Sequence, residues 1–515
     1  MEISYPSNNS LPRRLVQALW ICGSLSLAIR LWIGFTFPIT GDEAYFYQWG
    51  VYLDWGYYDH PPMVGWLISA MLYLFGDSTL AIRLPIIILP LALGALLWWA
   101  LSAVDRVRAA WAVLFFWLVP LNWLNTLITT DTPLIFWSVC SIAAMVRAEL
   151  RKDEDAKTLA LYALSGIFLG CAFLSKYFSV VLGLCYVAYV LLHRRSRWKA
   201  LLVLIVCALP GPAINIIWNM ANGWPNVMFN VFNRNQGEVF ELRKPVLYLL
   251  TYFYLLTPGV VWYAVKNTNA LGVVAKRWSI LMYLVCVPFI FFALISLKKV
   301  VGLHWVLSFY PVIFAVIALA LPMQTLKKCA TAIGAFTVLH LAALVFLYST
   351  SLPYWKSFKI YPEVVRSYRT QELLAQVEKE GAVIMGNAYT PSAIYAHTLK
   401  KYVPTFGVGK YHSRQDDVLI DFSAYNGKTI RVITFAKPDV SDYQDFFETT
   451  EIFSFNQDGA DFYVVHGTGF IFKNYKEKII NEIADRYYRI PLWLPLTDCP
   501  FCRRYCDAMR CTKPL

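Results

Sequence analysis

Charged side chains are scarce in this sequence. Asp, Glu, Lys and Arg make up only 15% of its 515 residues, whereas 58% are hydrophobic and the mean hydropathy is +0.48. This composition excludes an ordinary soluble protein and predicts a polytopic membrane protein. The net charge of +13 does not indicate a nucleic-acid partner, because the basic residues lie in short clusters between apolar runs, which is a topological pattern.

Internal repeats and low-complexity tracts are also absent, and no small-residue cleavage site follows the first apolar run. We therefore expect that run to remain as the first transmembrane helix. Crossing a bilayer takes roughly 20 mostly apolar residues, and about eleven segments qualify. The predicted spans are Leu15–Phe37, Leu80–Val104, Ala109–Leu124, Thr132–Glu149, Leu159–Leu174, Phe178–Leu192, Ala200–Trp218, Val246–Val265, Ser279–Leu297, Trp305–Leu321 and Ala330–Ser349.

The loops between these segments alternate in positive charge. One set is rich in basic residues, namely Arg13, Arg14, Arg106, Arg108, Arg147, Arg151, Lys152, Lys157, Arg194, Arg195, Arg197, Lys199, Lys266, Lys276, Arg277, Lys327 and Lys328. The alternate set contains only Lys176, Arg234, Arg243, Lys244, Lys298 and Lys299. The positive-inside rule therefore places the N-terminus in the cytoplasm and both the first loop and the C-terminal region outside.

Beyond residue 350 the chain becomes more charged and its apolar runs become shorter, which predicts a small extracytoplasmic α/β domain over 351–515 after a membrane domain over 1–350. The membrane domain includes a first outer loop over 38–79. In the C-terminal domain we expect helices over 371–381, 390–399 and 475–489, and strands over 382–386, 431–435, 449–455 and 461–466.

Cysteines form two groups. Seven lie in or beside the spans, where a thiol is usually an apolar filler. The other four are Cys499, Cys502, Cys506 and Cys511. An oxidising compartment favours one or two disulfides among these four over a zinc site or free thiols.

The first outer loop has no Lys or Arg between residues 41 and 62, but it contains Asp42, Glu43, Asp59 and His60. A charge at membrane depth costs at least about 2.5 kcal/mol, so these residues are candidates for a functional site. These residues could also be present simply because they favour the starts of helices. The residues around Asp42 favour a helix N-terminus, and the two prolines after His60 favour the start of a second helix over 63–75.

Asp131 and Lys176 lie in two other predicted outer turns. Asp131 opens the fourth span, where it could act simply as a helix cap, and Lys176 could be an ordinary surface lysine. Together with the first-loop acids, however, they fit the chemistry of group transfer from a lipid-linked phosphate. A carboxylate can accept the proton of an acceptor hydroxyl, and a nearby cation can neutralise the departing phosphate.

Six motifs, in order between about Leu15 and about Ser349, resemble those of bacterial C-type integral-membrane glycosyltransferases. This family includes enzymes related to protein O-mannosyltransferases and to the aminoarabinose and galacturonic acid transferases of lipid A. The motifs are DEAYFYQWG, WGYYDHPPMVGWLI, TTDTPLIFW, AFLSKYFSVV, WNMANGWPNVMFN and HWVLSFYP.

The resemblance implies an inverting transferase, independent of metals and other cofactors, with its active site on the periplasmic side of the bacterial inner membrane. Its donor would be a polyprenyl-phosphate sugar. By position, Asp42 would be the catalytic carboxylate, Asp59 and Asp131 the supporting acids, and Lys176 the cation at the donor phosphate. Further candidates for binding the donor or the acceptor are Glu43, His60, Arg243, Lys298 and His304.

One departure from the family limits the choice of sugar. Aminoarabinose transferases have Arg at the position of Tyr45 and Lys at the position of His60, so the resemblance does not imply aminoarabinose. For the acceptor, lipid A or lipopolysaccharide is the first choice, a protein hydroxyl the second and another envelope glycan the third. A transporter or flippase of lipid-linked sugars is the alternative from a different class, but no inverted repeat or broken helix pair is visible in the sequence.

Overall fold

The computed structural model describes residues 10–233, 239–409 and 414–506. Of the positions discussed above, Arg234 and Cys511 lie outside these ranges. The chain divides into two compact units, the first comprising residues 1–36, 77–213 and 237–347 and the second comprising 37–76, 214–236 and 348–515. The sequence-based division at residue 350 assigns the first outer loop to the membrane domain, whereas by packing this loop lies in one unit with the C-terminal region.

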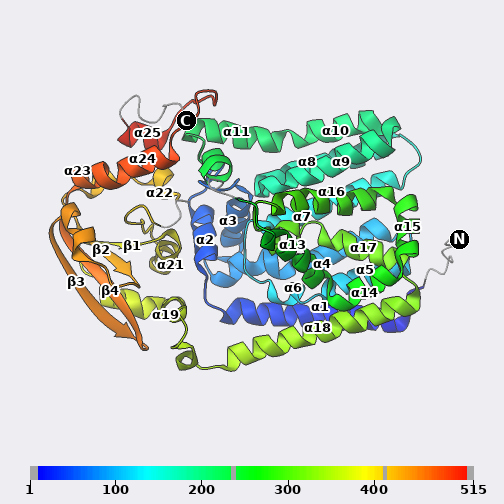
Figure 1. Ribbon diagram of the computed structural model, residues 1–515, viewed down its shortest axis with the longest axis horizontal. Helices are drawn as coiled ribbons and strands as arrows, with labels where there is room; N and C mark the ends of the chain where they lie inside the picture. The colour runs from blue at the N-terminus through cyan, green and yellow to red at the C-terminus, as the bar shows by residue number, and fades with distance from the viewer. Residues whose placement is uncertain (1–9, 234–238, 410–413, 507–515) are drawn as a thin grey trace. The chain divides into compact units, whose positions relative to one another are not determined.

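The first unit is helical, and Figure 1 labels most of its helices. The helices are α1 (Arg13–Thr36), α4 (Thr79–Leu101), α5 (Arg106–Leu118), α6 (Leu121–Leu124), α7 (Asp131–Glu149), α8 (Ala156–Ser175), η1 (Tyr177–Ser179), α9 (Val180–His193), η2 (Arg195–Arg197), α10 (Trp198–Ala208), α13 (Arg243–Leu256), α14 (Pro258–Lys266), α15 (Thr268–Arg277), α16 (Ser279–Ser296), η5 (Leu303–Val306) and α17 (Tyr310–Ala320). Two helices, α11 (Pro210–Asn222) and α18 (Met323–Ser349), run from the first unit into the second.

Within the described residues, six helices are long and apolar enough to cross a membrane, namely Arg13–Thr36, Thr79–Leu101, Ala156–Ser175, Arg195–Asn222, Ser279–Ser296 and Met323–Ser349. The pair α13 and α14 adds a seventh only if both are counted as one span, because they are bent by 92°. The span predicted over 246–265 is therefore broken at residue 257, and α13 and α14 form a broken helix pair that was not visible in the sequence. The cause of the bend is local, since Thr257 has a φ of 64° and Pro258 offers no N–H for a continuous helix. The total of eleven spans stays a prediction.

A buried arginine stabilises a proline-containing helix in the first unit. Pro90 lies inside α4 and has no N–H, so it cannot donate to the carbonyl of Ile86. The guanidinium of Arg30 donates to that carbonyl instead, and also to the carbonyls of Ile87 at 3.0 Å and Asn122 at 2.7 Å. Arg30 is 1% exposed, so its charge is solvated by backbone dipoles in place of water.

Two glycines allow α8 and α10 to pack closely. A Cβ atom at Gly166 would lie 2.2 Å from the carbonyl oxygen of Leu204, and one at Gly170 would lie 2.9 Å from that of Ala208. Their four-residue spacing puts both on one face of α8. Small residues at this spacing allow helices in a membrane to gain van der Waals contact along their backbones.

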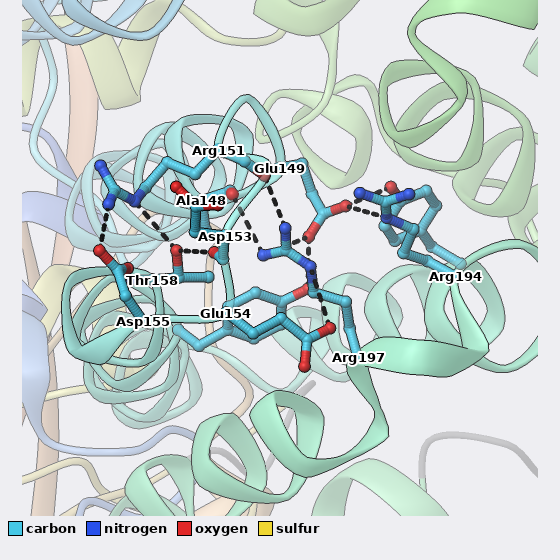
Figure 2. Close-up of polar contacts among 11 residues, drawn as sticks. Ala148, Glu149, Arg151, Asp153, Glu154, Asp155, Thr158, Arg194 and Arg197 are labelled. Carbon is cyan, nitrogen blue, oxygen red and sulfur yellow. Dashed lines mark hydrogen bonds and ion pairs between the residues drawn. The ribbon is translucent and has the colours of Figure 1, made fainter.

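A polar network joins two of the basic loops (Figure 2). The buried carboxylate of Glu149 accepts hydrogen bonds of 2.5 Å from the hydroxyls of Tyr162 and Tyr189, and it pairs with Arg197 at 3.7 Å. Arg197 also donates to the carbonyl of Arg151 at 2.6 Å. The loops that contain Arg151 and Arg197 were both predicted to face the cytoplasm, and they do lie at the same end of the helices.

The second unit combines short helices with one mixed sheet (Figure 1). Its helices are α2 (Gly41–Val51), α3 (Met63–Phe75), α12 (Pro225–Val227), η3 (Met228–Phe232), η6 (Leu352–Trp355), α19 (Tyr361–Tyr368), α20 (Thr370–Val377), α21 (Tyr389–Leu399), α22 (Asp416–Leu419), η7 (Phe422–Tyr425), η8 (Val440–Asp442), η9 (Gln444–Phe446), α23 (Phe472–Tyr475), η10 (Lys476–Ile480), α24 (Asn481–Tyr487) and α25 (Pro500–Tyr505). The strands are β1 (Ala382–Gly386), β2 (Thr429–Thr434), β3 (Phe447–Gln457) and β4 (Ala460–Phe470).

The sheet has the order β1-β2-β4-β3, with β1 parallel to β2 and the other pairs antiparallel. Side chains alternate between its two faces, and both faces are covered. On β2, Val432 belongs to a core with α24 and α25, whereas its neighbour Ile433 belongs to a core with α19, α20 and α21. All four strands predicted from the sequence are present. Three cover their predicted ranges, and β2 begins two residues before its predicted start and ends one residue before its predicted end.

The cysteines follow the predicted division. Cys499 and Cys502 form a disulfide, and Cys506 is also disulfide-bonded. The seven cysteines in or beside the predicted spans have free thiols. The disulfide expected in the C-terminal tail is therefore confirmed.

Candidate functional site

The two acids at the start of α2 have different environments. Thr40 is the N-cap of this helix, and its backbone N–H and hydroxyl each lie 3.1 Å from a carboxylate oxygen of Glu43. The backbone N–H of Glu43 in turn donates to the Thr40 hydroxyl, which completes a capping box. Glu43 is fully buried. The capping explanation left open by the sequence thus applies to Glu43, while the neighbouring Asp42 takes no part in the box.

Asp42 lies at the surface of the second unit, where part of its carboxyl reaches solvent. The surrounding protein still removes enough water to raise the pKa of Asp42 above its usual value of 3.8. A hydrogen bond from Tyr389 lowers that pKa and the nearby charge of Glu43 raises it, but the desolvation outweighs both. A carboxylate whose pKa is raised is a stronger base than an ordinary surface aspartate.

Asp59 and His60 precede α3, which begins at Met63 as the sequence predicts. Asp59 is 9% exposed, and one of its carboxylate oxygens lies 4.0 Å from the Nε2 atom of His60. The backbone carbonyl of Asp59 accepts a hydrogen bond of 2.9 Å from the side chain of Asn230. Asp59 thus has its main chain fixed and its side chain beside a titratable imidazole.

A cluster of asparagine side chains, none of them among the candidates predicted from the sequence, holds this part of the loop. The side-chain amide of Asn226 donates to the backbone carbonyls of Tyr57 and Tyr58, the latter at 3.0 Å. Its own oxygen accepts from Asn215 at 3.0 Å and Asn219 at 3.1 Å. Asn215, Asn219 and Asn226 are all at most 4% exposed.

A signal for this cluster was present in the sequence. Asn215 and Asn219 are four residues apart, as are Asn226 and Asn230, so each pair lies on one helical face. Amides repeated at this spacing among apolar residues indicate a buried hydrogen-bonded row. Trp224 lies in the same loop, and its indole N–H donates to the carbonyl of Pro495 at 2.7 Å.

In the first unit, Asp131 and Lys176 form an ion pair. The ammonium nitrogen of Lys176 lies 2.9 Å and 3.0 Å from the two carboxylate oxygens of Asp131, and each side chain is 10% exposed. Asp131 is the first residue of α7, and Lys176 directly follows α8. The two predicted outer turns therefore meet at one end of the helices.

Aromatic rings lie beside this ion pair. The ammonium group of Lys176 lies 5.6 Å from the ring centroid of Phe178, and Phe178 packs on Trp305 with ring centroids 4.3 Å apart. The neighbouring His304 is exposed. These contacts place Trp305 of η5, which follows His304 in the sequence, near Lys176. A joint role of His304 and Lys176 at a phosphate stays a prediction.

The remaining basic candidates belong to the first unit but have other surroundings. Lys298 is exposed, and its backbone carbonyl accepts a hydrogen bond of 2.8 Å from Lys244. Lys244 also pairs with Glu241 at 3.2 Å. Arg243 is exposed. Lys244 therefore joins two chain segments, and the predicted ligand roles of Arg243 and Lys298 stay predictions.

Each unit thus contains part of the predicted site. The second unit contains Asp42, Glu43, Asp59 and His60, and the first unit contains Asp131, Lys176, Arg243, Lys298 and His304. The sequence predicted that Asp131 and Lys176 lie in outer turns on one side, but it did not predict their ion pair. The meeting of the two sets in one pocket stays a prediction.

Comparison with known proteins gives relatives for both the sequence and the fold. Residues 59–218 match the family of dolichyl-phosphate-mannose-protein mannosyltransferases. Lipid A galacturonosyltransferase RgtD of Rhizobium johnstonii is 26% identical over 230 residues, which are 43% of this chain and 47% of RgtD. The aligned part thus spans about half the length of this relative.

The fold matches that of ArnT from Cupriavidus metallidurans. The crystal structure of ArnT bound to undecaprenyl phosphate aligns with a TM-score of 0.62 and 14% identity, covering 88% of this chain and 97% of ArnT. The chain has the ArnT fold. The apo structure of the same protein aligns with a TM-score of 0.59 and 15% identity, covering 88% of this chain and 98% of ArnT. The resemblance to C-type membrane glycosyltransferases that the motifs predict is confirmed.

Proposed function

We propose that this protein is an inverting glycosyltransferase that moves a sugar from a polyprenyl-phosphate donor to an acceptor of the cell envelope. The observation that carries the proposal is Asp42, a solvent-accessible carboxylate with a raised pKa at the position that the family motif assigns to the catalytic acid. The similarity of the fold to ArnT, which was crystallised with undecaprenyl phosphate, supports the donor class.

The reaction is a single displacement at the anomeric carbon. Asp42 accepts the proton of the acceptor hydroxyl as its oxygen bonds to that carbon. The bond between the carbon and the phosphate oxygen breaks, and the polyprenyl phosphate leaves with the electron pair. Attack from the face opposite the leaving group inverts the anomeric centre. Asp59, from the same loop, is the proposed supporting acid.

Lys176 is the proposed cation for the donor phosphate. Its ion pair with Asp131 holds the ammonium group in one orientation, and an ammonium has three N–H donors. Two of these can remain on the Asp131 carboxylate while the third binds a phosphate oxygen. His304 contributes a further N–H from the exposed end of η5. A fixed cation lowers the barrier because it needs no reorganisation as the phosphate departs.

Lipid A is the first-choice acceptor, supported by the similarity to RgtD, a lipid A galacturonosyltransferase. A protein hydroxyl is the second candidate, supported by the match to the protein mannosyltransferase family over residues 59–218. On this proposal the protein is a multi-pass protein of the bacterial inner membrane, with its N-terminus in the cytoplasm and with Asp42, Lys176 and the C-terminal region facing the periplasm.

The test compares a deletion strain complemented with the wild-type gene and with Asp42→Asn. Mass spectrometry of lipid A, envelope glycans and glycopeptides should find one sugar-sized mass that wild type restores and Asp42→Asn does not, at equal protein levels. The molecule that loses this mass is the acceptor. Full restoration by Asp42→Asn would contradict the proposal. Loss of translocation of a fluorescent polyprenyl-phosphate sugar across vesicles made with Asp42→Asn would favour a flippase instead.

A further inference from the structure

The start of helix α21, in the C-terminal region, is held in place by the strand before it and by the buried segment that follows. Strand β1 ends at Gly386, and the helix begins three positions later at Tyr389, with two residues between them. The segment from Pro391 to Ala396 is buried, and Tyr395 is part of the core on one face of the sheet. The side chain of Tyr389 is therefore attached to a rigid connection between strand and helix and not to a free loop.

Helix α2 packs on this start of α21. A Cβ atom at Gly41 would lie 2.6 Å from the Cβ atom of Thr390, so only glycine permits this approach. The rings of Tyr45 and Tyr389 meet edge to face with centroids 5.0 Å apart. Both contacts lie within one turn of Asp42, whose carboxyl is hydrogen-bonded to the Tyr389 side chain.

This hydrogen bond acts against the other influences on Asp42. Desolvation and the charge of Glu43 favour the protonated carboxyl, whereas the Tyr389 hydroxyl favours the carboxylate. Only the carboxylate can accept a proton from a hydroxyl. A carboxylate also has two oxygens. One oxygen held by Tyr389 leaves the other in a defined direction for the acceptor.

We propose that Tyr389, from the C-terminal region, is a positioning residue that orients the Asp42 carboxylate. The inference rests on the proposed function, because Tyr389 affects catalysis only if Asp42 is the catalytic base. It also assigns a role to the C-terminal region, in which no family motif was found. Substrate does not need to contact Tyr389, because its effect passes through Asp42.

A chemical probe of protonation tests the proposal without any sugar donor. Dicyclohexylcarbodiimide modifies carboxyl groups in their protonated form, so the fraction of modified Asp42 reports its titration. The purified full-length protein in detergent is labelled between about pH 4 and about pH 8, a range that starts near the ordinary Asp pKa, and peptides containing Asp42 are quantified by mass spectrometry. We expect the labelling midpoint of Tyr389→Phe at higher pH than that of wild type.

Tyr395→Phe is the matched control, because it removes a hydroxyl from the same helix beside Arg366 and away from α2. Its labelling midpoint should equal that of wild type. Equal midpoints for Tyr389→Phe and wild type, or equal shifts in both variants, would overturn the proposal.

Activity gives a separate readout. Tyr389→Phe should lower sugar transfer most at low pH and recover part of it at higher pH, because more Asp42 is ionised there. A purely structural defect would lower transfer equally at every pH and would leave the labelling midpoint unchanged. If the labelling shift occurs but Asp42→Asn still transfers sugar, the proposed function fails while the effect of Tyr389 on Asp42 stands.

Discussion

Lys176 and Asp131 form a nearly symmetric ion pair, with 2.9 Å and 3.0 Å between the ammonium nitrogen and the two carboxylate oxygens. The two residues are 45 positions apart and come from the ends of different helices. Their mutual neutralisation allows two charges to remain almost buried next to apolar rings. Removing one partner would leave the other as an uncompensated charge.

We therefore expect Lys176→Gln or Asp131→Asn alone to lower stability by about 3 kcal/mol, the lower end for a broken buried pair. The double variant should lose clearly less than the sum of the two, because no charge remains unpaired. Thermal unfolding of the four proteins in the same detergent provides the measurement. If the losses of stability in the two single variants added up to that of the double variant, the pair would contribute no coupling free energy.

Asp42 should make activity and stability respond oppositely to pH. Activity should rise with pH through its pKa, which lies above the ordinary value of 3.8. A raised pKa in the folded state means that folding favours the protonated form, so the stabilisation present below the ordinary pKa is lost as the pH rises through the raised one. The variant Asp42→Asn cannot ionise at this position, so it does not lose this stability as the pH rises. It should be inactive, with a melting temperature that falls less than that of wild type across this pH window.

The asparagine cluster should control the order of the first outer loop. Asn226→Ala would leave the carbonyls of Tyr57 and Tyr58 without their amide donor, and each unsatisfied buried group costs about 1–3 kcal/mol. Hydrogen exchange should become faster at residues 57–60. Asn230→Ala is the comparison variant, because the Asn230 side chain donates to the carbonyls of Asp59 and Asn226 and not to those of Tyr57 and Tyr58. Unchanged protection in Asn226→Ala would show that other contacts hold the loop.

Arg30 and Pro90 should be coupled. Arg30→Met would leave the carbonyl of Ile86 without a donor, because Pro90 supplies none, and should cost about 1–3 kcal/mol. The Asn122 carbonyl would still accept from the Ser26 hydroxyl at 3.4 Å. Pro90→Ala would restore an N–H facing the carbonyl of Ile86, so it should recover part of that loss in the Arg30→Met background. When Arg30 is present, the N–H introduced by Pro90→Ala would compete with the guanidinium for the carbonyl of Ile86. The gain in stability would therefore be smaller than in the Arg30→Met background. An equal effect of Pro90→Ala in both backgrounds would exclude the coupling.

The sequence alone determined the features that depend on local composition. Apolar runs of sufficient length predicted the six described helices that are long enough to cross a membrane. The strand-like segments predicted four strands that the structure contains. Prolines before Met63 predicted the start of α3 at that residue. The charge bias of the loops also predicted that the turns of Asp131 and Lys176 share one side. These features can be read locally because helix and strand periods and the cost of crossing a bilayer act on neighbouring residues.

Only the tertiary structure decided which side chains are partners. Asp42 and Glu43 are adjacent and both acidic, yet Glu43 closes a capping box whereas Asp42 is hydrogen-bonded to a tyrosine 347 positions later. The bend between α13 and α14 likewise interrupts a run that is apolar throughout. No period in the sequence specifies such contacts, because they depend on how packed elements distant in the chain bring single groups within hydrogen-bonding distance.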